Sequence, residues 1–122
     1  MRTWMMLAAI SGFLGVAFGA FGAHGVADPA AKEWLRTGAQ YQFVHSLAVI
    51  GAAVFVAQGA RLARLAPAFF LGGTVLFSGS LYAMALGGPR VLGAVTPLGG
   101  LAFMVGWLML AWSARKLAQP SV

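Results

Sequence analysis

The side chains best able to do chemistry are concentrated in one short stretch, which reads QYQFVHS from Gln40 to Ser46. Tyr41 and His45 are four residues apart, so on a helix they would share one strip of surface. Gln42 and Ser46 would share the neighbouring strip for the same reason. The stretch opens a long apolar segment, so we expect it to enter a lipid bilayer. Polar side chains in a bilayer face a protein partner, a ligand or trapped water.

A second strip of polar side chains occurs in a later apolar segment, where Thr74, Ser78 and Tyr82 repeat every four residues. A rise of about 1.5 Å per helical residue places most polar side chains in the outer half of the membrane, with Thr74 as the exception. We therefore predict an outer polar cluster that binds a lipid or small amphiphile, or that locks the helices together. Its candidate members are His24, Gln40, Tyr41, Gln42, His45, Ser78, Ser80, Tyr82 and Thr96.

The two histidines, His24 and His45, are the side chains that would titrate near neutral pH. Two histidines on adjacent helices could ligate a haem or a metal ion. Further ligands are few, because the chain has no cysteine and its two carboxylates lie outside the apolar segments. Met84 has a suitable depth but is more typical of packing. No cofactor is therefore predicted, and a haem, metal or quinone site on the two histidines is the alternative.

Nucleophilic catalysis would need a serine with a positioned base. Ser46 follows His45 directly, but adjacent helical residues point about 100° apart and make a poor dyad. The run Phe77 to Ser80 has the letters FSGS but lacks the strand-to-helix elbow of a hydrolase nucleophile. The pattern favours a non-enzymatic protein over an enzyme.

Composition decides the broad class of protein. The 122 residues are 61% hydrophobic and only 8% charged, and the mean hydropathy is +0.86. A soluble domain of this length could not bury so much apolar surface, whereas a bilayer can act as its solvent. The net charge of +6 is dispersed at the ends of apolar runs, so no nucleic-acid partner is predicted.

Four apolar segments are long enough to span a bilayer as helices, since about 20 residues are needed. The predicted spans are 4–23, 38–58, 67–86 and 97–113, within a single domain over 1–122. A cleaved signal peptide is the alternative for the first span, but the apolar run is longer than is usual. Asp28 before Pro29 predicts a helix cap, and 29–37 suits a short interfacial helix with Trp34 in lipid. Thr96 before Pro97 repeats the cap signature.

The first segment carries small residues at helical spacing, which predicts close packing against another helix backbone. An oligomer seam is the alternative, but three partner helices in the same chain favour packing within one copy. These residues are Gly12, Gly15, Gly19, Gly22 and Ala23.

Basic residues predict the orientation in the membrane. Arg2, Arg61, Arg64, Arg115 and Lys116 fall on one side, whereas Lys32, Arg36 and Arg90 fall on the other, with both acids. Both termini should therefore face the cytoplasm. The inner half of the membrane then holds few polar side chains, which argues against a pore through one copy. An oligomeric transporter or channel, with its pore between copies, is the alternative.

Several motifs together resemble a known family. They are FGAFGAHG at Phe18–Gly25, Trp34 with Gln40-Tyr41-Gln42 and His45, FSGSLY at Phe77–Tyr82, and TPLGG at Thr96–Gly100 followed by Gly106-Trp107. In these the chain resembles the domain-of-unknown-function 423 family of small membrane proteins, which is similar to the mitochondrial transmembrane protein 256 type. The resemblance implies a bacterial inner-membrane protein and brings no reaction, ligand or catalytic residue.

Overall fold

The computed structural model describes residues 1–119, and within that range every regular element is a helix. The long helices are α1 (Arg2–His24), α2 (Pro29–Ala57), α3 (Ala66–Ala85) and α4 (Thr96–Ser113). Short 3₁₀ helices lie between or after them: η1 (Arg61–Leu65), η2 (Arg90–Ala94) and η3 (Ala114–Lys116). The predicted all-α fold with four membrane-length helices is confirmed over the described residues. Residues 120–122 of the predicted domain lie outside this range.

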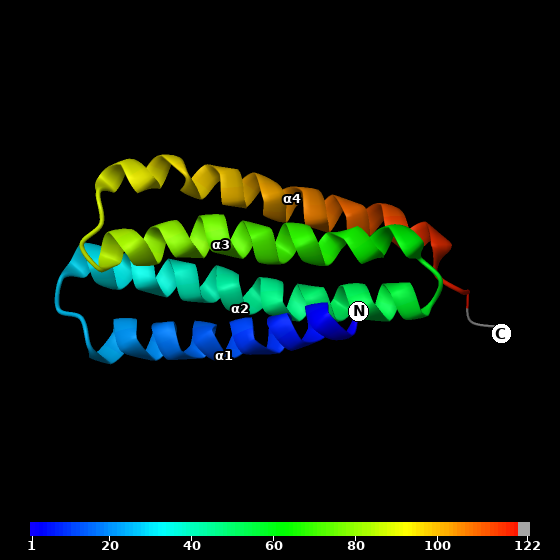
Figure 1. Cartoon of the computed structure of the whole chain (residues 1–122), viewed down its shortest axis with the longest axis horizontal. Coiled ribbons are helices and arrows are strands. Elements are labelled where there is room, and N and C mark those ends of the chain that lie inside the picture. The colour runs from blue at the N-terminus through cyan, green and yellow to red at the C-terminus, as the bar shows by residue number, and fades with distance from the viewer. Residues whose placement is uncertain (120–122) are drawn as a thin grey trace.

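The long helices lie side by side in chain order, and each runs antiparallel to the next (Figure 1). Each of them packs mainly against its neighbours in sequence, and α2 also contacts α4. The α1–α2 and α3–α4 connections share one end of the bundle, which we call the α1–α2 end. The α2–α3 connection and both chain ends share the other, which we call the terminal end (Figure 1).

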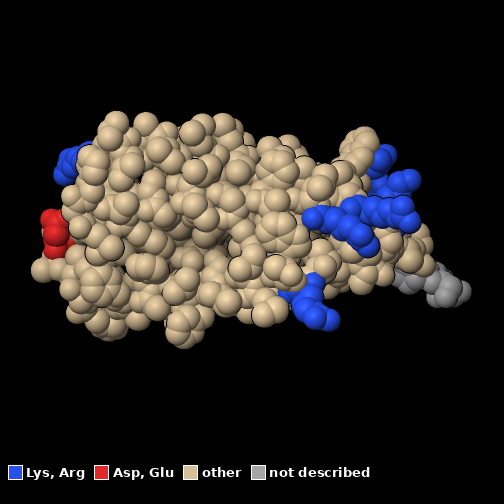
Figure 2. Space-filling view, in the orientation of Figure 1, with Lys and Arg blue, Asp and Glu red and all other residues tan. Residues whose placement is uncertain are grey.

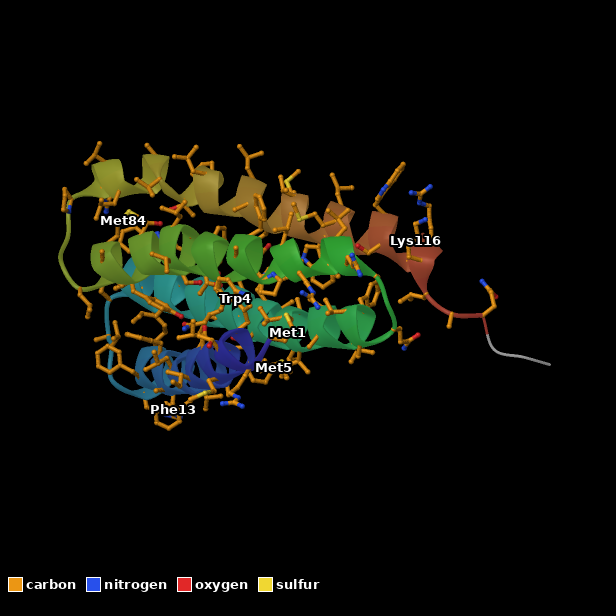
Figure 3. The ribbon with its side chains drawn as sticks, turned by 45° about the vertical axis from the view of Figure 1, so that its right-hand side comes forward. Met1, Trp4, Met5, Phe13, Met84 and Lys116 are labelled. Carbon is orange, nitrogen blue, oxygen red and sulfur yellow. The ribbon has the colours of Figure 1, made fainter. Side chains whose placement is uncertain are left out.

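The surface suits a lipid environment. Large apolar side chains such as Phe13, Val75 and Leu108 are 72%, 71% and 69% exposed, and Phe13 points away from the bundle (Figure 3). Charged side chains gather toward the two ends of the face shown in Figure 2, which leaves an uncharged band between them. Such a band needs hydrocarbon rather than water around it. The chain is a multi-pass membrane protein.

The predicted interfacial helix over 29–37 is wrong as a separate element. These residues form the first turns of α2, which continues for 29 residues, or about 43 Å. The start is as predicted, because the Asp28 carboxylate accepts a hydrogen bond from the Ala31 N–H at 3.0 Å. No residue after Thr37 interrupts α2. Gly38 lies inside this helix, and its lack of a side chain makes room for a residue of α3. A Cβ on Gly38 would lie 2.6 Å from the Tyr82 ring.

The small residues of α1 face α2 rather than the outside. A Cβ on Gly15 would lie 3.4 Å from the Gln42 side chain, and one on Gly19 would lie 3.4 Å from Ala39. Gly12 and Gly22 continue the same face, whereas Ala23 is exposed at its edge. The stripe therefore lets α1 approach α2 within one copy of the chain.

Glycines also bring the backbones of α3 and α4 close together. A Cβ on Gly99 would lie 2.7 Å from the Gly73 carbonyl oxygen and would also collide with the Phe77 backbone nitrogen. Farther along, Phe70 is fully buried and its ring occupies the space left by Gly106. The interior at the terminal end is apolar, and it consists of Ala8, Ala48, Val49, Ala52, Ala63, Ala66, Phe70 and Leu110.

Gly99→Ala should weaken the α3–α4 contact, because the obstructing atoms are backbone and cannot rotate away. We expect a loss of roughly 1–3 kcal/mol in the free energy of unfolding, the usual range for overpacking. Titration of the purified protein from mild detergent into SDS measures it.

Gly100→Ala is the matched control, because no atom lies within 4 Å of its added Cβ. It should stay within about 0.5 kcal/mol of the wild type. Equal losses in the two variants would contradict the proposed steric cause.

Candidate functional site

The Gln42 side chain is a junction between three helices. Its Oε1 accepts a hydrogen bond from the Tyr82 hydroxyl of α3 at 2.6 Å. Its Nε2 donates to the Ser11 hydroxyl of α1 at 3.2 Å. Gln42 and Tyr82 are buried, and the Phe18 ring of α1 stacks on the Tyr82 ring at 4.1 Å between centroids. One amide thus joins α1, α2 and α3 beside a hollow of about 440 Å³ that Ser11, Gln42 and Tyr82 help to line.

Ser78 and Ser80 make further contacts between helices. The Ser78 hydroxyl donates to the Gly38 carbonyl oxygen of α2 at 2.7 Å. The hydroxyls of Ser80 and Thr96 lie 2.6 Å apart and join α3 to α4. The prediction that Thr96 caps α4 is wrong. α4 begins at Thr96 itself without a side-chain cap bond, because this hydroxyl is engaged with Ser80.

His45 connects α2 to α4 through both ring nitrogens. The Trp107 indole N–H donates to Nε2 at 3.1 Å, and Nδ1 lies 2.6 Å from the Tyr41 carbonyl oxygen. An indole nitrogen can only donate, so Nε2 accepts and the proton sits on Nδ1. The ring also stacks on Phe103, with centroids 3.5 Å apart. This arrangement holds a neutral imidazole in one tautomer.

His24 lies far from His45. Gly22 packs against Leu35, and Leu35 precedes His45 by ten residues, or about 15 Å along the helix. His24 is farther out still and is exposed at the end of α1. The two histidines therefore do not converge on one point. Within the described part of the chain, no group of three His, Cys, Asp or Glu side chains could hold a metal ion.

Three of the predicted cluster residues are exposed and do not belong to the buried group. Gln40 and Tyr41 are exposed like His24, and the Tyr41 ring packs against Phe77 at 4.5 Å between centroids. Met84 is buried near Gly93 of η2, at the α3–α4 connection (Figure 3). The structure thus brings together Gln42 with Tyr82, and Ser80 with Thr96, while Ser78 and His45 pair with other groups. His24, Gln40 and Tyr41 stay outside these pairs.

Two partners were not predicted from the sequence as members of the cluster. Ser11 was detectable, because it is the only hydroxyl-bearing residue in the first predicted span. Trp107 was visible only as part of a motif, since nothing in its spacing indicates a histidine partner. We call the hydrogen-bonded side chains Ser11, Gln42, His45, Ser78, Ser80, Tyr82, Thr96 and Trp107 the polar lock.

Gln42→Leu should destabilise the protein, because it removes both inter-helix bonds and leaves Tyr82 and Ser11 facing an apolar side chain. The expected loss is about 0.5–2 kcal/mol, the scale of hydrogen bonds between membrane helices. SDS unfolding of the purified protein measures the change.

Gln40→Leu is the control, since it makes the same substitution two residues away on an exposed position. It should leave stability within about 0.5 kcal/mol. A loss as large in Gln40→Leu as in Gln42→Leu would mean that the junction does not stabilise the bundle.

Comparisons with known proteins relate the chain to membrane proteins. The profile of a family described as "Protein of unknown function (DUF423)" matches residues 18–100. The chain is 43% identical to the UPF0382 inner membrane protein YgdD of Escherichia coli (strain K12), covering 99% of this chain and 95% of the relative. It is 41% identical to a UPF0382 membrane protein of Haemophilus influenzae, covering 93% and 94%.

A more distant relative is the UPF0382 membrane protein YwdK of Bacillus subtilis, which is 38% identical over 95% of this chain and 98% of the relative. No solved structure matches the chain significantly. The family resemblance drawn from the motifs is confirmed, since the profile covers most of the chain. This protein belongs to the DUF423 family of membrane proteins.

Proposed function

We propose that the protein is a non-enzymatic helical module of the bacterial inner membrane, in which the polar lock holds the helices together near the middle of the bundle. One observation carries this proposal. The polar atoms of the Gln42 junction and of His45 are directed at other helices or at backbone carbonyls. A site built to receive a ligand would instead leave donors or acceptors free to meet it.

The same contacts weaken the alternatives based on chemistry. Ser78 and Ser80 donate to or pair with oxygen atoms of neighbouring residues, and neither is paired with His45. A metal or haem would need a free nitrogen on His45, but one nitrogen carries the proton and the other accepts from Trp107. A haem, metal or quinone site on the histidines would require this part of the bundle to be rebuilt.

An oligomeric transporter or channel also finds little support. A pore between copies would need polar side chains on the outward faces at mid-membrane depth. The outward residues there include Phe13, Val75 and Leu108, which are large and apolar. Lipid satisfies such a surface without any second copy.

We further propose that both termini are cytoplasmic. Five basic residues belong to the terminal end and three to the α1–α2 end, where both acids also lie. Cytoplasmic segments usually carry the excess of Lys and Arg. The Escherichia coli relative is named an inner membrane protein, which supports the same membrane here.

Reporter fusions test this topology. Alkaline phosphatase inserted at Gly87 should be active, because the α1–α2 end would be periplasmic. The same enzyme inserted at Gly59 should be inactive, whereas green fluorescent protein at the C-terminus should fluoresce. The reverse pattern would refute the orientation.

The lock itself is tested by a double-mutant cycle on Gln42→Leu and Tyr82→Phe, measured by SDS unfolding. If the two side chains stabilise each other, their effects should be non-additive by roughly 0.6 kcal/mol, up to about 1.7. Pairing Tyr82→Phe with Gln40→Leu gives the control cycle and should be additive. Additivity in both cycles would remove the support for a lock.

A further inference from the structure

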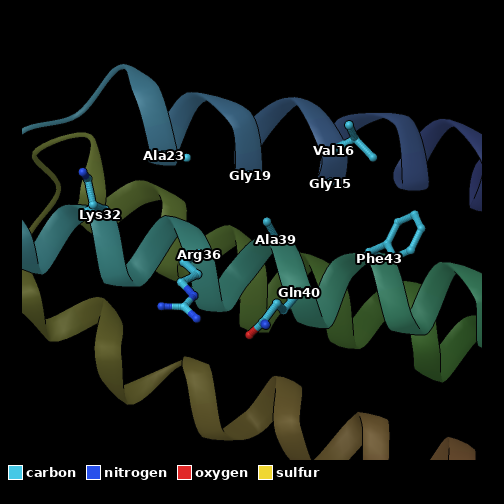
Figure 4. A pocket seen from close by; sticks show the side chains of 10 residues that line it. Gly15, Val16, Gly19, Ala23, Lys32, Arg36, Ala39, Gln40 and Phe43 are labelled. Carbon is cyan, nitrogen blue, oxygen red and sulfur yellow. The ribbon is translucent and has the colours of Figure 1, made fainter.

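A groove on the lipid-facing side of α1 and α2 lies apart from the polar lock. Its volume is about 590 Å³, and α1 contributes Gly15, Val16, Gly19, Gly22 and Ala23 to its lining. α2 contributes Lys32, Arg36, Ala39, Gln40 and Phe43 (Figure 4). The groove shares none of the hydrogen-bonded side chains of the polar lock.

The polar residues of the groove follow one another along α2, and in Figure 4 the Lys32 side chain extends toward α1 whereas Arg36 and Gln40 extend away from it. Lys32, Arg36 and Gln40 are spaced by four residues, so they follow one strip of α2. All of them are exposed, and all of them can donate hydrogen bonds. Within residues 1–119, no carboxylate oxygen lies within 4.0 Å of the charged nitrogens of Lys32 or Arg36. Two exposed cations therefore stand at the rim of an apolar groove, with the carboxylates of Asp28 and Glu33 within one helical turn of them.

The depth of this strip matches the layers of a bilayer. Gly22 faces Leu35, so Lys32 and Arg36 flank the level at which α1 ends and lipid head groups begin. From Arg36 to Phe43 the groove descends roughly 10 Å, out of about 15 Å for the hydrocarbon of one leaflet. Its lower walls are Gly15, Val16 and Phe43, which offer hydrocarbon and close backbone approach.

We propose that this groove binds a phospholipid with an anionic head group. Lys32 and Arg36 contact the phosphate and head-group charge through charge-assisted hydrogen bonds. Gln40, one turn deeper, donates to an ester carbonyl of the glycerol. One acyl chain lies over the exposed lining residues Val16, Ala23 and Phe43. The order of side chains down the groove thus follows the order of chemical groups down the lipid. This inference goes beyond the proposed function and does not depend on the polar lock.

Native mass spectrometry of the detergent-solubilised protein, titrated with palmitoyl-oleoyl phosphatidylglycerol, tests the proposal. The wild type should bind one phosphatidylglycerol more tightly than it binds phosphatidylcholine of the same chains. The Lys32→Ala/Arg36→Ala variant should lose roughly tenfold or more in affinity, given the usual attraction per cation near anionic lipid. Ala23→Phe should also weaken binding, because its ring would occupy the groove from an exposed position.

Arg61→Ala/Arg64→Ala is the matched control, since it removes the same charge from the terminal end. It should bind phosphatidylglycerol as the wild type does. Inorganic phosphate, tested as a competitor at millimolar concentration, should not displace the lipid if the acyl chain contributes.

Equal losses in the two double-alanine variants would overturn the site, because binding would then reflect net charge alone. Displacement by phosphate would overturn the lipid as occupant. Full binding by Ala23→Phe would show that the chain lies elsewhere. SDS unfolding of each variant confirms that it is folded, so a failed binding result is not confused with loss of the bundle.

Discussion

A polar side chain surrounded by hydrocarbon must find its partner inside the protein, and the Gln42 amide is where this constraint acts most strongly. An unpaired amide in lipid costs several kcal/mol, so the helices are held at whatever rotation keeps its two bonds intact. Tyr82 and Ser11 supply those bonds from α3 and α1. His45 connects α2 to α4 in the same way, because its ring accepts a hydrogen bond from Trp107. Both residues belong to α2, which packs against each of the other three long helices.

Hydrogen bonds of this kind require close backbones, and the small residues provide them. Gly38 leaves the space that the Tyr82 ring fills, which allows the phenol to reach Gln42. Gly15 does the same on the α1 side, where a Cβ would meet the Gln42 side chain at 3.4 Å. The glycines and the polar side chains therefore act together: the glycines let the helices approach, and the polar side chains then form hydrogen bonds between them. Apolar packing alone gives little specificity between helices in lipid, since the lipid competes equally well.

The fold could be predicted because apolar length and the Asp28 cap are local properties of the sequence. It could not be predicted that residues 29–37 continue into the second span as one helix. The charges at Lys32 and Arg36 indicate a surface in contact with water, but they do not end a helix. Spacing showed which polar residues share a strip, such as Gln42 and Ser46. It could not show which strips meet, because helix rotation is set by the packing of apolar side chains. Ser46 instead bonds the carbonyl oxygen of Gln42 within its own helix.

The stretch from Gln40 to His45 has side chains that face the bundle interior and side chains that face the surrounding membrane. Gln40 and Gln42 are the same residue type, yet two positions on a helix differ by about 200° in direction. Gln42 is therefore turned into the bundle and Gln40 outward, beside the groove of Lys32 and Arg36. An outward glutamine in a membrane still needs a hydrogen-bond acceptor, and the lipid that we propose would supply one through an ester carbonyl. The constraint that closes the bundle on one side of α2 thus favours a bound lipid on the other.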